Sequence, residues 1–400
     1  MSKPPLSNTG HVVIFASLYP PCEKAGSILV MHELLSHFDP NSFTVITATR
    51  SGARRISPEH GHRVFRIMHN TYLSGRANVI WRLIQVPLSI RLATRIVKRL
   101  RPSVIVGVYP EFEFLHIAQK VAASQKIPWV AYLLDAVSHC DSRTVFGLMH
   151  RRIKKNTFRD ASCVSVISKG MADYYKNEEG IQMRVLTHIC PDLPISTSLC
   201  AVANRAFMGG SIYSVNTHAA ARIAKAMSKL NAQLVITTSG SDLQLASAGL
   251  YGPHIVRTFY ATIQDYQIAL SQSSFLVLAL DWPDETRIGK EAMETIFPTR
   301  TMEYLISGRP ILVHCPEHYF LAQFFRAHEC GVVVSERSGD GLLRACNQML
   351  SDKVAITQVV ERARMTATEF SAQKVSRSFA ETIAHVEKLE WAQKLPIAKE

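Results

Sequence analysis

The chain has 400 residues, of which 47% are hydrophobic and 19% are charged, which excludes a disordered or fibrous protein and suits two domains. Its 45 Lys and Arg residues against 32 Asp and Glu residues give a net charge of +13. We therefore expect an acidic partner, and nucleic acid, a membrane surface and an anionic substrate all fit this charge.

Short apolar segments alternate with amphipathic helices along the first half of the chain. Strands are predicted over 11–16, 43–48, 64–67, 104–108, 129–134, 163–167 and 184–189, and helices over 27–37, 77–100, 112–125, 146–159 and 169–177. Such β-branched runs separated by helices are typical of a parallel sheet that is covered on both faces.

A polar, proline-containing segment at 190–204 predicts a linker, after which the alternation resumes. Strands are predicted over 205–208, 234–238, 255–258, 275–280, 311–314 and 332–334, and helices over 216–230, 262–272, 300–307, 318–328 and 354–390. The predicted fold class is α/β, with two doubly wound Rossmann-like domains facing across a cleft. We place the domains at 1–195 and 196–375, followed by a helical tail at 376–400 that packs back on the first domain.

The cysteines and the N-terminus bear on the cellular compartment. The eight cysteines form no CxxC motif and several lie inside apolar runs, which favours buried, reduced thiols and a cytoplasmic protein. Residues 1–10 are polar and carry no signal-peptide core. No apolar run approaches the roughly 18 residues of a membrane span.

The most specific motif lies at 297–313 and reads FPTRTMEYLISGRPILV. Its proline and threonine predict the start of a helix, and its glycine and second proline predict the end. The start of a helix presents unpaired N–H groups to an anion, and Arg300 adds a positive charge there. Glu303 lies one turn further on, within reach of ligand hydroxyls. The alternative is a capped helix with a solvated Glu303 and a paired Arg300.

This segment resembles the donor-binding segment of GT-B glycosyltransferases, and of glycosyltransferase family 4 in particular. Many bacterial members carry a segment similar to Pro-Ser/Thr-Lys/Arg-x-x-Glu-Tyr-Leu-x-x-Gly-Lys/Arg-Pro-Ile. Further stretches similar to the family lie at 17–27, 127–135, 160–169, 207–216 and 329–334. The resemblance implies the GT-B fold, an acceptor-binding first domain, a nucleotide-sugar-binding second domain and a retaining transferase of the hexosyltransferase type (EC 2.4).

The resemblance also implies a set of donor-binding residues. They are Gly26, Gly209, Gly210, Ser211, Thr299, Arg300, Thr301 and Glu303. Glu303 matches the second glutamate of the family's E-x7-E motif, which binds the ribose, while Thr295 replaces the first glutamate. Tyr213 and Asn216 stand where many members have an Arg/Lys pair that binds diphosphate. Arg300 and two helix N-termini are therefore expected to do more of the phosphate binding.

Transfer of a sugar with retention places positive charge on the sugar and negative charge on the leaving diphosphate, so the site needs a fixed positive environment. Arg300 and the N–H groups at 299–301 are expected to supply it without a metal, and the nucleotide sugar is a co-substrate, with no further cofactor expected. The acidic stretch at 281–285 is interpreted as a solvated turn rather than a metal site.

Two carboxylates of the first domain follow predicted strand ends, where ligands gather in α/β folds. Asp135 is assigned, with Glu303, a catalytic role, the alternative being a helix cap. Glu111 is assigned to the acceptor, although surface exposure would explain it equally well.

Positive charge is concentrated in the first domain. Residues 1–195 carry +12 of the net +13, and segment 60–110 has nine Lys and Arg residues and no acid. The basic residues Arg91, Arg95, Lys98 and Arg99 share one helix face beside an apolar stripe. This pattern predicts a surface for anionic lipid or an anionic acceptor, the alternative being a core-packing helix with a solvated back. No nucleic acid is expected, because no binding module accompanies the charge.

Together these features predict a cytoplasmic glycosyltransferase, peripheral at the inner face of the membrane, that moves a sugar to a glycan or lipid-linked acceptor in surface polysaccharide or glycolipid biosynthesis. The alternatives are a catalytically degenerate GT-B scaffold or partner subunit, which the replacement at Thr295 favours, and a GT-B nucleotide-sugar epimerase. The sequence leaves the sugar, the nucleotide, the acceptor and the oligomeric state open.

Overall fold

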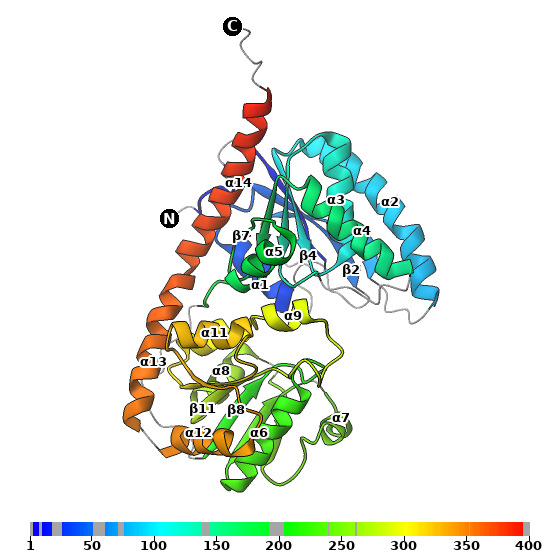
Figure 1. The fold of residues 1–400 in the computed structure, drawn as a ribbon. Coiled ribbons are helices and arrows are strands. Elements are labelled where there is room, and N and C mark those ends of the chain that lie inside the picture. The colour runs from blue at the N-terminus through cyan, green and yellow to red at the C-terminus, as the bar shows by residue number, and fades with distance from the viewer. Residues whose placement is uncertain are drawn as a thin grey trace. The chain divides into compact units, whose positions relative to one another are not determined.

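The computed structural model describes residues 3–7, 10–17, 26–50, 61–70, 76–137, 145–191, 204–238, 240–260, 262–351 and 353–394. The chain divides into two compact units (Figure 1). The first comprises 1–189 and 372–400, and the second comprises 190–371. The chain thus returns to its first unit at residue 372.

The first unit is built on a parallel sheet of seven strands in the order β3-β2-β1-β4-β5-β6-β7. Its strands are β1 (Val12–Phe15), β2 (Phe43–Arg50), β3 (Arg63–Asn70), β4 (Val104–Tyr109), β5 (Trp129–Leu133), β6 (Cys163–Val166) and β7 (Arg184–Val185). Its helices are α1 (Gly26–Ser36), α2 (Arg76–Leu100), α3 (Phe112–Gln125), α4 (Val145–Asp160), α5 (Lys169–Glu179) and α14 (Ala372–Lys394).

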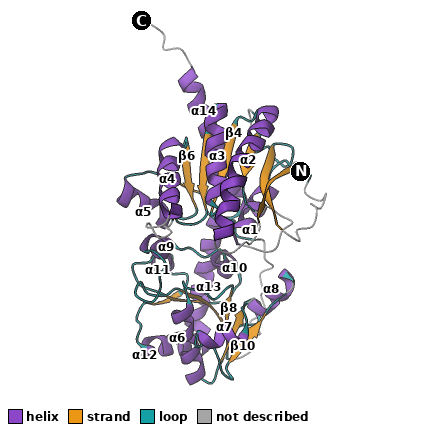
Figure 2. Cartoon of the chain, turned by 90° about the vertical axis from the view of Figure 1, so that its right-hand side faces the viewer, coloured by secondary structure: helices purple, strands orange, loops and turns teal. Residues whose placement is uncertain are grey.

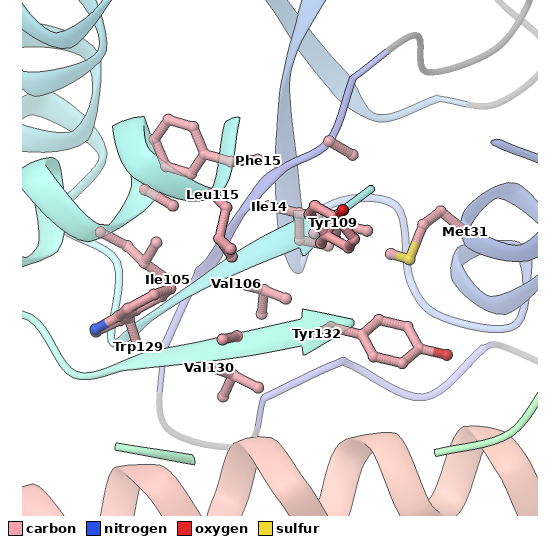
Figure 3. Close-up of a cluster of buried hydrophobic side chains, with 14 of the residues drawn as sticks. Ile14, Phe15, Met31, Ile105, Val106, Tyr109, Leu115, Trp129, Val130 and Tyr132 are labelled. Carbon is pink, nitrogen blue, oxygen red and sulfur yellow. The ribbon is translucent and has the colours of Figure 1, made fainter. Parts of the chain in front are cut away.

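Helices cover both faces of this sheet. α2, α3 and α4 lie side by side on one face, while α1 and α14 pack together on the other (Figure 1). The strands β1, β4 and β5 are buried along their whole length, which explains their nearly continuous apolar sequences. Figure 3 shows their side chains between Leu115 of α3 and Met31 of α1.

A buried carboxylate fixes α14 to the start of the chain. Glu387 Oε1 accepts hydrogen bonds from the hydroxyls of Ser7, at 2.5 Å, and Ser103, at 2.6 Å. Phe379 and Ile383 of the same helix belong to the core of the first unit. The C-terminal helix is therefore an integral part of that unit.

The second unit has a parallel sheet of six strands in the order β10-β9-β8-β11-β12-β13. Its strands are β8 (Arg205–Gly209), β9 (Gln233–Thr237), β10 (Ile255–Thr258), β11 (Phe275–Ala279), β12 (Ile311–His314) and β13 (Val332–Val334). Its helices are α6 (Thr217–Lys229), α7 (Asp242–Ser247), α8 (Ile263–Ser271), α9 (Lys290–Thr295), α10 (Arg300–Ile306), α11 (Phe320–Ala327), α12 (Gly339–Ser351) and α13 (Lys353–Ala367), with a short 3₁₀ turn at Thr368–Phe370.

Alternation along the strands of this sheet gives the second unit two cores. Met208 and Val277 face α6 and α12, whereas Phe207 and Leu278 face the side of α10 and α11. Figure 2 shows helices flanking the strands of both units. Because successive strand residues point to opposite faces, both faces of a doubly wound sheet must be apolar.

The predicted fold class is confirmed, since both sheets are parallel and alternate with helices. The segment 354–390 is helical as predicted, and it forms two helices, α13 in the second unit and α14 in the first. The described cysteines form no disulfide with one another, and Cys190, Cys315, Cys330 and Cys346 are buried. No helix among the described residues is long and apolar enough to cross a membrane.

Candidate functional site

The glycine loop of the second unit lies where its strand order reverses. β8 is flanked by β9 and β11, and the chain leaves β8 at Gly209 and Gly210. The carboxyl ends of strands at such a reversal are the usual ligand position in open α/β sheets. Gly210 has a φ of 88°, a conformation that favours glycine. The exposed Ser211 follows.

Arg300 lies directly against this loop. A Cβ atom on Gly210 would come within 2.7 Å of Cζ, Nη1 and Nη2 of Arg300, so the guanidinium packs on the bare α-carbon. The Arg300 side chain is half-buried at the start of α10. Among the described residues, no carboxylate lies within ion-pair distance of it. The structure therefore brings a cation to the end of β8.

Glu303 lies one turn further along α10 and joins the same group. Tyr266 of α8 donates a hydrogen bond to its carboxylate, and Arg300 attracts it electrostatically. Burial nevertheless raises the pKa of Glu303 above its usual value. Tyr304 reaches back to the loop, where its hydroxyl oxygen accepts the Gly209 N–H at 2.8 Å. Burial raises the pKa of Tyr304 to about 12.

The start of α10 offers fewer N–H groups than the sequence suggested. The Thr301 N–H donates to Pro298 O at 2.9 Å, so it is not available to a ligand. Thr299 is exposed and its side chain makes no cap hydrogen bond. Of the phosphate-binding groups expected at 299–301, there remain the Arg300 side chain and the backbone N–H groups before Thr301.

A second expected phosphate position, the N-terminus of α6, is occupied by the protein itself. Asp281, which is fully buried after β11, accepts the Ala219 N–H on Oδ1 at 2.7 Å. Burial raises the pKa of this carboxyl, and the donated backbone N–H opposes that effect. Since one carboxylate already lies at the positive end of the helix, a phosphate there would meet like-charge repulsion. The carboxylate of the protein itself therefore compensates part of the positive end of α6.

The acidic stretch 281–285 contains a turn whose Asp284 is exposed, as predicted, but Asp281 and Glu285 are largely buried. Glu285 forms a two-point ion pair with Arg222 of α6, at 2.6 and 3.1 Å, and both side chains are largely buried. The Nε atom of Arg222 donates to His314 Nε2 at 3.0 Å. The Arg222 guanidinium also lies 4.5 Å from the centre of the Trp282 ring. This network attaches the loop after β11 to α6 and β12.

Replacing Glu285 with alanine is expected to destabilise the second unit by about 2–4 kcal/mol, because it leaves the Arg222 charge largely buried without its partner. Urea unfolding measures this loss. Glu317→Ala is the matched control, since Glu317 pairs with Arg326 in the same two-point manner but both side chains are about half exposed. An exposed pair contributes about 1 kcal/mol or less. Equal losses in the two variants would contradict the role of burial.

In the first unit, two predicted site residues follow neighbouring strands at one edge of the sheet. Asp135 comes after β5 and Glu111 after β4. Although the Asp135 side chain reaches solvent, the surrounding protein raises its pKa to about 6. Glu111 is half-buried at the N-cap of α3 and makes no side-chain cap bond there. Gly26 begins α1, while most of the preceding loop lies outside the described residues.

One face of α2 combines basic and apolar side chains that are exposed. We call this set the basic face: Ile84, Leu88, Arg91, Leu92, Arg95, Lys98 and Arg99. Ile84 and Leu88 are more than half exposed, at 53% and 55%. On α4, beyond α3, Leu148 is exposed by 59% beside the exposed Arg151 and Arg152. The apolar stripe predicted beside the basic residues consists of Leu88, Leu92, Ile96 and Leu100. It is divided, because Ile96 and Leu100 pack on the core whereas Leu88 and Leu92 are exposed.

Sequence reasoning missed Tyr266 and Asp281 as members of the site. Both contact it through tertiary structure, and no motif marked them. Thr295, which replaces the family's first glutamate, is buried, and its hydroxyl donates to Glu291 O at 2.7 Å. Within the described ranges, no three His, Cys, Asp or Glu side chains gather as metal ligands would.

No protein-family model and no curated protein sequence matches the chain. Solved structures do match. Anabaena Alr3699/HepE in complex with UDP-glucose has a TM-score of 0.69 and 12% identity, over 94% of this chain and 100% of that one. Sucrose-phosphate synthase from Thermosynechococcus elongatus has a TM-score of 0.68 and 12% identity, over 96% and 100%.

The lipopolysaccharide outer core galactosyltransferase WaaB, in its apo form, has a TM-score of 0.62 and 11% identity, over 93% of this chain and 99% of that one. At these identities the likeness establishes the fold. The structural neighbours are glycosyltransferases of the GT-B type, which confirms the predicted architecture of two Rossmann-like domains.

Proposed function

We propose that this protein is a glycosyltransferase that moves a sugar from a nucleotide-sugar donor to a glycan or lipid-linked acceptor, with retention of configuration. The observation that carries the proposal is the Arg300 guanidinium, which packs on Gly210 at the end of β8 with Glu303 one helical turn away. A cation beside a glycine loop suits a diphosphate, and a nearby carboxylate suits ribose hydroxyls. HepE, a structural neighbour, was solved with UDP-glucose.

In the proposed reaction, the acceptor oxygen forms a bond to the anomeric carbon as the bond between the sugar and the diphosphate breaks. The leaving diphosphate gains negative charge and takes up the proton of the acceptor hydroxyl. Arg300 stabilises that charge from a fixed position, which lowers the barrier because the cation needs no reorganisation. We propose that this residue replaces a metal in the transfer. The carboxylate of Asp135 is proposed to stabilise the positive charge that develops on the sugar.

A thermal-shift screen of UDP-, GDP- and ADP-sugars tests the donor assignment. A true donor at 100 times its dissociation constant stabilises the protein by about 2.7 kcal/mol. Product analysis with lipid-linked acceptors then determines the linkage and the anomeric configuration. If none of these donors stabilises the protein and Glu303→Ala changes nothing, the proposed site is wrong and a degenerate scaffold becomes the better explanation.

We also propose that the protein binds the surface of an anionic membrane, where it meets an acceptor of polysaccharide or glycolipid biosynthesis. The support is the basic face of α2, whose exposed Arg91, Arg95 and Arg99 lie beside the exposed Ile84 and Leu88. Basic residues attract anionic headgroups by about 1 kcal/mol each, and apolar side chains can enter the interface. An uncharged partner would not explain the basic residues.

Reversing Arg91, Arg95 and Arg99 to glutamate is therefore expected to lower binding to vesicles that contain anionic phosphatidylglycerol by at least about 100-fold. Co-sedimentation measures this partition, and the binding should also weaken as salt rises. Lys225→Glu, Lys229→Glu and Arg344→Glu together form the matched control, since these exposed residues of α6 and α12 give the same change in charge. Equal binding by both triple variants would rule out docking through the basic face.

A further inference from the structure

Two tyrosine hydroxyls lie between the glycine loop and Glu303. Tyr266 comes from α8, whose first turn is fixed by the Thr262 hydroxyl accepting the Asp265 N–H at 3.0 Å. Its ring packs edge-on against Phe207 of β8, with centroids 5.5 Å apart. Tyr304 comes from α10 and is fully buried. Packing on both rings therefore fixes where the two hydroxyls lie.

Each of the two hydroxyls contacts a polar group of the site. The Glu303 carboxylate has no proton, so the Tyr266 hydroxyl must donate to it. The Tyr266 hydroxyl also interacts with that of Tyr304, which lowers the pKa of Tyr304 against the effect of burial. The Tyr304 oxygen accepts the Gly209 N–H at 2.8 Å. Tyr304 thus contacts the glycine loop, while Tyr266 contacts Glu303.

The loop is shaped to admit these hydroxyls. A Cβ atom on Gly209 would lie 2.7 Å from the Tyr266 hydroxyl oxygen and 3.2 Å from that of Tyr304. The space that a side chain would fill is therefore occupied by the tyrosines. This close approach explains why the last residue of β8 is a glycine, independently of any contact with a phosphate.

We propose that Tyr266 is a positioning residue of the donor site, which holds the Glu303 carboxylate in the orientation that binds the ribose and links it to the backbone of the glycine loop. The inference rests on the proposed function. A carboxylate on a half-buried helix can rotate, and one donated hydrogen bond restricts its torsion angles to a single arrangement.

The charges around Glu303 support this role. Burial raises the pKa of Glu303, whereas the hydrogen bond from Tyr266 and the positive charge of Arg300 lower it. Burial raises the pKa of Tyr266 well above its usual value, so the hydroxyl keeps its proton and remains a donor throughout the physiological range. Removing that donor leaves the carboxylate both less fixed and less readily ionised.

The test compares ribonucleotides with their deoxy analogues. Isothermal titration measures the dissociation constants of the wild type for UDP, 2′-deoxy-UDP and 3′-deoxy-UDP. If UDP does not bind, the corresponding GDP and ADP sets are used. The discrimination ratio is the dissociation constant of the deoxy analogue divided by that of the ribonucleotide. A hydrogen bond from a ribose hydroxyl to a carboxylate predicts a ratio of about 10 or more. In Tyr266→Phe we expect this ratio to fall to about 3 or less, while the fold is retained.

Tyr260→Phe is the matched control, because Tyr260 is the neighbouring ring, with its centroid 6.4 Å from that of Tyr266, and it should keep the full ratio. A ratio that stays at its wild-type value in Tyr266→Phe overturns the inference even if overall affinity falls, since a purely structural defect would weaken ribo- and deoxynucleotides alike. A wild type that binds no nucleoside diphosphate overturns the proposed function instead.

Discussion

Replacing Arg300 with alanine is expected to lower kcat/KM for the sugar donor by about 100- to 1,000-fold, the usual loss when one preorganised group that stabilises developing negative charge is removed. The guanidinium lies against the bare α-carbon of Gly210, and the N-terminus of α6 is already occupied by Asp281. Steady-state kinetics with the donor identified by thermal shift, and titration with the nucleoside diphosphate product, measure the effect.

Arg344→Ala is the control for charge, because Arg344 is exposed on α12 of the same unit and its loss changes the net charge equally. Arg300→Lys should recover only part of the activity, since an ammonium group cannot contact two phosphate oxygens in the manner of a guanidinium. Wild-type kinetics in Arg300→Ala, with unchanged affinity for the diphosphate, would show that the donor phosphates bind elsewhere.

The strands were predictable from the sequence because they are buried on both faces. β4 and β11, for example, are apolar at nearly every position and end at polar or proline-containing turns. Helices of six residues were not predictable in this way. α7 and α9 are shorter than two turns, so no apolar periodicity distinguishes them from loops.

The site was predictable only where a local motif carries it. Gly209, Gly210, Arg300 and Glu303 lie in two short motifs, and the structure brings both motifs to the end of β8. Tyr266 reaches Glu303 from a different helix, and nothing in its own neighbourhood in the sequence indicates that contact. Local sequence cannot report which side chains tertiary packing places together.

The acidic stretch 281–285 also shows that local sequence does not reveal tertiary partners. Several acids beside a proline indicate a solvated turn, because isolated carboxylates are rarely buried. Asp281 is buried and Glu285 is largely buried nonetheless, because the backbone at the start of α6 and the side chain of Arg222 compensate their charges. Those partners lie more than 60 residues away in the chain.

Replacing Asp135 with asparagine is expected to lower kcat by about 100-fold or more, since the amide keeps the shape of the side chain and removes the charge proposed to stabilise the sugar. The pH dependence is the sharper readout. With its pKa raised to about 6, the Asp135 carboxyl is mostly ionised at pH 7 and mostly protonated at pH 5. Below pH 6 the wild-type kcat should therefore fall about tenfold for each pH unit.

The variant should lack this acidic limb, because an asparagine does not titrate in that range. Asp173→Asn is the control for folding and for charge, since Asp173 is an exposed residue of α5 that pairs with Lys169 at 3.4 Å. It should keep both the wild-type rate at pH 7 and the limb below pH 6. If kcat of Asp135→Asn still falls below pH 6, another group titrates near that pH. The loss of rate at pH 7 then measures only the effect of removing the Asp135 charge. If it retains both the limb and the rate, Asp135 has no part in the reaction.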